Sequence, residues 1–259
     1  PPRSTLFPYT TLFRSPSPYQ LTGIIKALQI EFNPGLLNPT HNNMKYSDNF
    51  DKALNLGVYG ADLAYANMYD QIPLAINYFG VIKLITQDLG LDHAFDGKTI
   101  NRIEKNMTNK DSLLFIMSSS YRKADAFLKE NQREETGVLI LAGGWIESLY
   151  LITKLAEENQ NTILIARIGE HKYPLKNLIK MLQPYANTEK YNKLLEAFSD
   201  LDLSFEQVKF IYIYKPPQTS EKDKITFINS TSESKITKES LAEISKKVIG
   251  LRKFIIQEN

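Results

Sequence analysis

Two acidic residues stand inside long apolar segments, where a charged side chain is unusual. Asp62 lies within a helix predicted over residues 47–71, and Glu147 lies within one predicted over residues 134–158. Buried carboxylates must be paired or have raised pKa values. Two carboxylates on facing helices are also an arrangement that can act as general acid and base. These two acids are therefore the strongest candidates for chemistry in the chain.

Aromatic and basic residues elsewhere in these helices allow two interpretations of the acids. Arg122 and Arg167 are available counter-charges, which predicts an internal salt-bridge network that pins the helices together. Tyr65, Trp145 and Tyr150 are candidate walls of an interhelical pocket that binds a small molecule. The pocket interpretation requires both acids to share an accessible cavity. The candidate ligand-binding residues are Asp62, Tyr65, Arg122, Trp145, Glu147, Tyr150 and Arg167.

Sequence motifs for other kinds of chemistry are weak. The histidines His41, His93 and His171 lack a second ligand at metal-site spacing, so we predict no metal site. The pair Gly57-x-x-Gly60 follows no strand and lacks the third glycine of a dinucleotide-binding fingerprint. We therefore predict no catalytic residue of a known motif and no cofactor.

Glycines precede both acids and suggest close helix packing. Gly57 comes shortly before Asp62, and Gly143 and Gly144 lie one turn before Glu147. Helix faces without large side chains let another helix approach closely. The parallel between the two segments is also compatible with an internal duplication, which would relate two helix pairs by a pseudo-twofold axis. The small-residue stripe on the first of these helices is Gly57, Ala61, Ala64 and Met68.

The first fifteen residues differ in character from the rest of the chain. Residues 5–15 are similar to the in-frame translation of a short-read sequencing adapter and lack helical or strand periodicity, so we expect residues 1–15 to be a non-native segment. Two of the 31 basic residues, Arg3 and Arg14, lie there, which leaves residues 16–259 with 29 acidic residues and an equal number of basic ones. A neutral chain gives no electrostatic reason to expect nucleic acid or an anionic membrane as partner.

Cysteine content and apolar runs exclude two further classes. The chain has no cysteine, which excludes disulfides and thiolate metal sites. The apolar stretch over residues 138–155 is interrupted by Glu147, so its longest uninterrupted run is well short of the roughly 18 residues that a membrane span needs. We predict a buried core helix there and no transmembrane segment.

Hydrophobic periodicity predicts a mainly α-helical protein, an irregular antiparallel bundle of about eight to ten helices. Ser47 and Asn109 are suitable N-caps, Pro73 suits a first helical turn, and Gly90 suits a helix end. Residues 32–47 contain turn-forming pairs and are predicted to be loop. The predicted helices cover about residues 19–30, 47–71, 73–90, 99–107, 109–128, 134–158, 163–171, 174–183 and 188–200.

The C-terminal part has a different pattern. Apolar alternation over residues 208–214, ended by Pro216-Pro217, predicts a strand, with a second strand over residues 225–232 and a terminal helix from Thr237. An isolated two-stranded hairpin is marginal in water, so this one must lie against a helix. We therefore expect residues 206–259 to pack on the helical body, and residues 16–259 to form one domain.

Three segments resemble those of uncharacterised bacterial cell-envelope proteins that are lipoprotein-like and mostly helical. These segments are Ala53–Gln71, Ala142–Glu147 and Ser17-Pro18-Tyr19. The resemblance implies a signal peptide with a lipid-attachment cysteine upstream of Pro16, and thus a location in the periplasm or tethered to the outer membrane. It implies no activity. Without a signal peptide the protein is instead a cytoplasmic helical interaction domain.

The leading functional expectation is a non-enzymatic, envelope-associated binding or structural module, with a small molecule or a protein as its partner. The alternative is an enzyme that uses Asp62 and Glu147 in an interhelical pocket. The two expectations differ in how accessible the carboxylates must be. An enzyme needs at least one carboxylate open to a cavity, whereas a scaffold keeps both paired and sealed.

Overall fold

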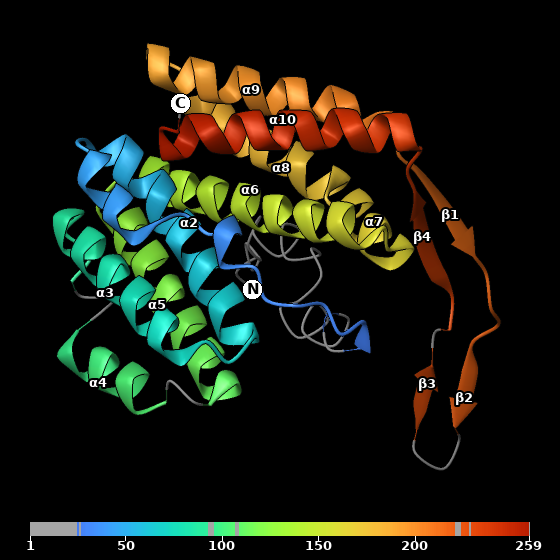
Figure 1. Ribbon diagram of the computed structural model, residues 1–259, viewed down its shortest axis with the longest axis horizontal. Coiled ribbons are helices and arrows are strands. Elements are labelled where there is room, and N and C mark those ends of the chain that lie inside the picture. The colour runs from blue at the N-terminus through green and yellow to red at the C-terminus, as the bar shows by residue number, and fades with distance from the viewer. Residues whose placement is uncertain are drawn as a thin grey trace, which may run out of the picture.

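The protein is mainly α-helical, as predicted, with nine α-helices (α2 to α10) in the part of the chain that the structure describes. Figure 1 shows the helices packed around α6 and a β-ribbon at one end. The segment 1–15 and most of the helix predicted over residues 19–30 lie outside the described residues. This computed structural model describes residue 25 and residues 27–92, 96–106, 109–220, 224–227 and 229–258.

Two long helices form the centre of the fold. α2 (Asn49–Met68) and α6 (Glu134–Asn159) lie along one another in the most extensive contact between described helices. The N-cap of α2 is Asp48, whose side chain accepts a hydrogen bond from the backbone N of Asp51 at 2.9 Å, so the predicted cap at Ser47 is one residue early. α6 is largely buried, as expected for a core helix.

Glycines let the backbones of α2 and α6 touch. A Cβ atom on Gly57 would lie 1.9 Å from the carbonyl oxygen of Ile140, and one on Gly143 would lie 1.8 Å from the carbonyl oxygen of Leu54. No side chain fits at either position, which confirms the steric role predicted for Gly57. Asp62 and Glu147 lie about one turn after these contacting glycines, so the close contact of α2 and α6 places both acids in the same buried region.

Helices α3 (Ile72–Asp88), α4 (Gly97–Lys105) and α5 (Lys110–Glu130) lie on one side of this pair. Pro73 occupies the first turn of α3, and Gly90 adopts a left-handed φ of 66° just after its end, both as predicted. α3 follows α2 after a short turn and packs against it.

The remaining helices lie on the other side of α6. They are α7 (Thr162–Gly169), α8 (Lys172–Leu182), α9 (Glu189–Phe205) and the C-terminal α10 (Lys238–Ile256). α10 packs against both α6 and α9 (Figure 1). This position places the last helix beside the central pair.

The segment over residues 32–47, predicted as loop, contains two short 3-10 helices, η3 (Pro34–Leu36) and η4 (Thr40–Lys45). The stretch between them passes through the core, where Leu37 is 5 % exposed and Asn38 is fully buried. Buried backbone groups outside regular structure must find other hydrogen-bond partners. Those partners are side chains of the cluster described below.

The strands form one ribbon in two parts. β1 (Lys209–Ile213) pairs antiparallel with β4 (Thr231–Lys235), and β2 (Gln218–Ser220) pairs with β3 (Ile225–Phe227). The single second strand predicted over residues 225–232 is therefore wrong in extent. The break falls opposite Pro216-Pro217, which have no N–H to donate to the partner strand.

The ribbon contacts the helices at its base. The Ser234 hydroxyl donates to the carbonyl oxygen of Ala166 in α7, and the ring of Phe210 lies 5.2 Å from that of Tyr173. Farther along, Tyr212 and Tyr214 are 65 % and 66 % exposed, and the ribbon extends away from the body (Figure 1). The predicted packing against a helix thus holds for the base and not for the outer part.

Candidate functional site

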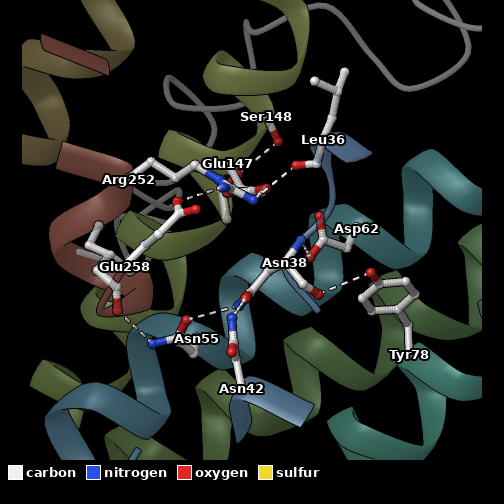
Figure 2. Close-up of polar contacts among 12 residues, drawn as sticks. Leu36, Asn38, Asn42, Asn55, Asp62, Tyr78, Glu147, Ser148, Arg252 and Glu258 are labelled. Carbon is white, nitrogen blue, oxygen red and sulfur yellow. Dashed lines mark hydrogen bonds and ion pairs between the residues drawn. The ribbon is translucent and has the colours of Figure 1, made fainter. Parts of the chain in front are cut away.

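Arg252 of α10 is the cation that pairs with Glu147. Its Nε donates to Oε2 at 2.8 Å and its Nη2 donates to Oε1 at 2.9 Å, a bidentate pair that Figure 2 shows. Nη2 also donates to the carbonyl oxygen of Leu36 at 2.9 Å. The guanidinium lies over the ring of Tyr150, 4.1 Å from its centre. One arginine therefore joins α10, α6 and the segment over residues 32–47, which we call the N-terminal loop.

Asp62 completes this group from α2. Its Oδ2 accepts a hydrogen bond from the backbone N of Asn38 at 3.2 Å, and its Oδ1 has no hydrogen-bond donor among the described protein groups. Asp62 and Glu147 are both 0 % exposed. Burial raises the pKa of Asp62 well above its usual range, and the charge of Glu147 raises it further. Burial also raises the pKa of Glu147, and Arg252 opposes that shift.

Asn38 connects the acids to a wider buried network (Figure 2). Its Nδ2 donates to the hydroxyl oxygen of Tyr46 at 3.0 Å, and its Oδ1 accepts from Nδ2 of Asn42 at 2.8 Å. The hydroxyl of Tyr78 in α3 donates to the backbone carbonyl of Asn38 at 3.0 Å. The loop segment is thus bonded through its backbone to side chains of both α2 and α3.

A second contact ties α10 to α2. Nδ2 of Asn55 donates at 2.9 Å to the carbonyl oxygen of Ile255, near the end of α10. Asn55 is fully buried. We call Asp62, Glu147, Arg252 and Asn38 the clamp, because together they join α2, α6, α10 and the N-terminal loop.

The structure brings together Asp62, Glu147 and Tyr150 of the seven predicted site residues, and places the other two aromatic residues elsewhere. Trp145 lies two residues before Glu147, on the far side of α6, where its ring is 5.5 Å from that of His171. Tyr65 packs against Phe32 at 5.4 Å in a separate aromatic cluster. Trp145 and Tyr65 therefore do not line a shared pocket with the acids.

The predicted counter-charges are wrong. Arg167 of α7 forms an ion pair at 2.7 Å with Glu170, the residue just after the end of that helix. Arg122 is exposed on α5. The cation is instead Arg252, which sequence reasoning missed, although it lies one turn after Val248 on the buried face of an amphipathic helix.

Two surface hollows in the described part of the chain lie away from the clamp. The larger, about 730 Å³, lies between the starts of α2 and α9, and Nζ of Lys190 there bonds both Asp48 at 2.6 Å and Asp51 at 3.0 Å. The smaller, about 290 Å³, is lined by residues of α4 and α5 that include Phe115. Neither of these two hollows is lined by Asp62 or Glu147, and both acids are 0 % exposed, so the requirement of the pocket interpretation is not met.

The fold and the site define a mainly α-helical protein with a sealed acid–arginine clamp in its core. Among the described residues, no group of three acidic, histidine or cysteine side chains is placed to hold a metal ion. One described helix, α6, is long and apolar enough to cross a membrane, and 72 % of its apolar window is buried within the protein. No protein-family model, curated protein or solved structure matches this chain.

Proposed function

We propose that the chain is a non-enzymatic helical module and that the clamp is structural. The observation that supports this proposal is that Asp62 and Glu147 are both fully buried while Arg252 is committed to three hydrogen bonds. A general acid or base must come within hydrogen-bond distance of a substrate proton. Two sealed carboxyl groups do not meet that condition, so a partner binds on the outer surface of the module.

The clamp gives the module one defined arrangement of its ends. Arg252 bonds Leu36, which is 216 residues away in sequence, and Glu147, which is 105 residues away. Replacing a buried ion pair by apolar residues is often neutral or stabilising, whereas removing one partner is strongly destabilising. The clamp therefore acts through specificity, because packings that leave Glu147 or Arg252 unpaired are unfavourable.

Chemical labelling of carboxyl groups tests whether the acids are sealed. The folded protein is treated with a carbodiimide and an amine, and each carboxylate is followed by mass spectrometry of peptides. We expect Glu189, whose side chain is 81 % exposed, and Asp200, at 60 %, to be modified, while Asp62 and Glu147 are not. Denatured protein is the control, in which all four must react. Modification of Asp62 or Glu147 in the folded protein at rates comparable to Glu189 would overturn the proposal in favour of the enzyme alternative.

Association with the bacterial envelope is part of the same proposal and is supported by the resemblance of three segments to cell-envelope proteins. The test is fractionation of cells that express the complete reading frame. The protein is expected in the periplasmic or membrane fraction. Recovery only from the cytoplasmic fraction would leave a cytoplasmic interaction module.

A further inference from the structure

We propose that the folded protein holds one proton between Asp62 and Glu147, carried by Asp62, and that the clamp weakens when rising pH removes it. This inference rests on the proposed clamp and adds a condition under which it opens. It makes the clamp a pH-sensitive contact between the N-terminal loop, α10 and the central helices.

The hydrogen-bond donors around the two acids account for every oxygen except one. Arg252 donates to both oxygens of Glu147, and its remaining bond goes to the carbonyl of Leu36. Asn38 donates to Oδ2 of Asp62. Oδ1 of Asp62 is buried and receives no donor from the described protein. A buried ionised oxygen without a donor is strongly unfavourable, whereas a protonated carboxyl is itself a donor.

Glu147 is the neighbouring acid that favours this proton. The two carboxyl groups interact electrostatically, because the charge of Glu147 raises the pKa of Asp62 beyond the effect of burial. Two carboxyl groups that share a site cannot both ionise easily, so one pKa is raised strongly. The position of Arg252 determines which of the two carboxyl groups has the strongly raised pKa, because a bidentate arginine pair requires both oxygens of Glu147 as acceptors. The ionised member is therefore Glu147, and Asp62 holds the proton.

Among the described residues, the groups around Asp62 supply no second cation. Arg252 is the cation of the cluster and is already bonded to Glu147. Burial raises the pKa of Tyr46, Tyr59 and Tyr78, so these phenols stay neutral over the range in which a carboxyl titrates. The charged and titratable groups that face the pair are Tyr46 of the loop, Tyr59 of α2, Tyr78 of α3, Tyr150 of α6, Arg252 of α10 and Glu258 beyond it.

Deprotonation of Asp62 places a second negative charge beside Glu147. The repulsion acts on the segment that carries Leu36 and Asn38, and on α10 through Arg252. Because folding raises the pKa of Asp62, the folded state binds this proton more tightly than the unfolded chain does. The contribution to stability is therefore complete below the usual aspartate pKa of about 3.9 and is lost as pH rises through the folded pKa.

The substitution Asp62→Asn tests the proton directly. An asparagine amide keeps an acceptor for the backbone N of Asn38 and a permanent donor toward Glu147, and it does not titrate in this range. Urea unfolding is measured from pH 5 to pH 9. Relative to Asp62→Asn, the unfolding equilibrium constant of the unsubstituted protein should rise by up to about tenfold per pH unit until Asp62 has ionised. The matched control Asp200→Asn, at an exposed acid, should keep the unsubstituted pH dependence.

A second measurement does not depend on how the variant folds. In ¹³C NMR of the unsubstituted protein, the side-chain carboxyl signal of Asp62 should stay at the position of a protonated acid at pH 6. An ionised Asp62 at pH 6, or the same pH dependence in Asp62→Asn and the unsubstituted protein, would overturn the inference. Either result would leave the sealed structural clamp intact, because that proposal is tested separately by carboxyl labelling.

Discussion

Replacing Gly143 with alanine is expected to destabilise the protein strongly, although the change adds only one methyl group. A Cβ atom at this position of α6 would lie 1.8 Å from the carbonyl oxygen of Leu54 and 2.7 Å from its carbonyl carbon. Optimal contacts between nonbonded heavy atoms lie near 3.5 Å, so the two helix backbones must separate by roughly 1.5 Å. The obstacle is backbone, which cannot rotate away as a side chain does.

The expected magnitude follows from what this separation disrupts. α2 and α6 make the most extensive helix contact in the described chain. A gap of about 0.5–1 Å forfeits a quarter to a half of the attraction between facing atoms. Overpacking that side chains can absorb costs about 1–3 kcal/mol, so a clash between backbones should exceed the whole of that range and cost about 4 kcal/mol or more. Alanine gains up to about 1 kcal/mol over glycine in a helix, which leaves an expected net loss of about 3 kcal/mol or more.

Gly80→Ala is the matched control, because a Cβ atom on Gly80 of α3 would meet no atom within 4 Å. That variant should be stabilised by about 0.5–1 kcal/mol, the helix propensity difference alone. Both free energies of unfolding are measured by urea denaturation, with circular dichroism as the helical signal. If Gly143→Ala unfolds at the same urea concentration as the unsubstituted protein, or if the two variants shift alike, the close contact between α2 and α6 is refuted.

Three further predictions concern the clamp, a buried histidine and the ribbon. Arg252→Met leaves Glu147 buried without its cation and should lower the free energy of unfolding by about 3–5 kcal/mol. The control Lys193→Met, at an exposed ion pair, should change the free energy of unfolding by less than about 1 kcal/mol in the same urea assay. Burial lowers the pKa of His171 to about 4, so stability should fall as pH drops from about 6.5 toward 4, by up to about 3 kcal/mol. In His171→Gln, the part of the stability loss that comes from the histidine should be absent. If the free energies of unfolding of the variant and the unsubstituted protein differ by the same amount at every pH, this prediction is contradicted. Replacing residues 215–229 with Asn-Gly, a two-residue hairpin turn, should leave the melting temperature within about 2 °C of the unsubstituted value. The reason is that the ribbon packs on the helices only at its base. A larger fall in a calorimetric scan would show that the outer ribbon contributes to the stability of the core.

Helix ends set by local chemistry could be predicted from the sequence. Asn109 caps α5 by accepting a hydrogen bond from the backbone N of Ser112 at 2.9 Å, and Gly90 supplies the left-handed residue after α3. At the start of α2, Ser47 and Asp48 are adjacent residues that are both suitable caps. Asp48 is also bonded by Nζ of Lys190 in α9 at 2.6 Å, a tertiary contact that the local sequence does not reveal.

The acids of the site could be predicted and their partner could not. Asp62 and Glu147 stand out because each interrupts an apolar helix, a signal that is local in sequence. Arg252 lies on a helix whose apolar stripe already explains its packing, and a long side chain at the edge of such a stripe usually extends to water. Only the placement of α10 against α6 turns it inward. Trp145 and Tyr65 lie close to the acids in sequence, but Trp145 projects from the opposite side of its helix and Tyr65 packs in a separate aromatic cluster.

The clamp makes the two ends of the described chain depend on one another. The bond from Arg252 to Leu36 and the bond from Asn55 to Ile255 close loops of 216 and 200 residues. The entropy needed to close a loop grows only slowly with its length, so even these contacts form readily once the ends are near. Until α10 docks, however, Glu147 lies between α2 and α6 without a cation, and burying an unpaired carboxylate is unfavourable. The close packing of α2 on α6 and the docking of α10 therefore stabilise one another, and the N-terminal loop completes both because its carbonyl group takes the last bond of the arginine.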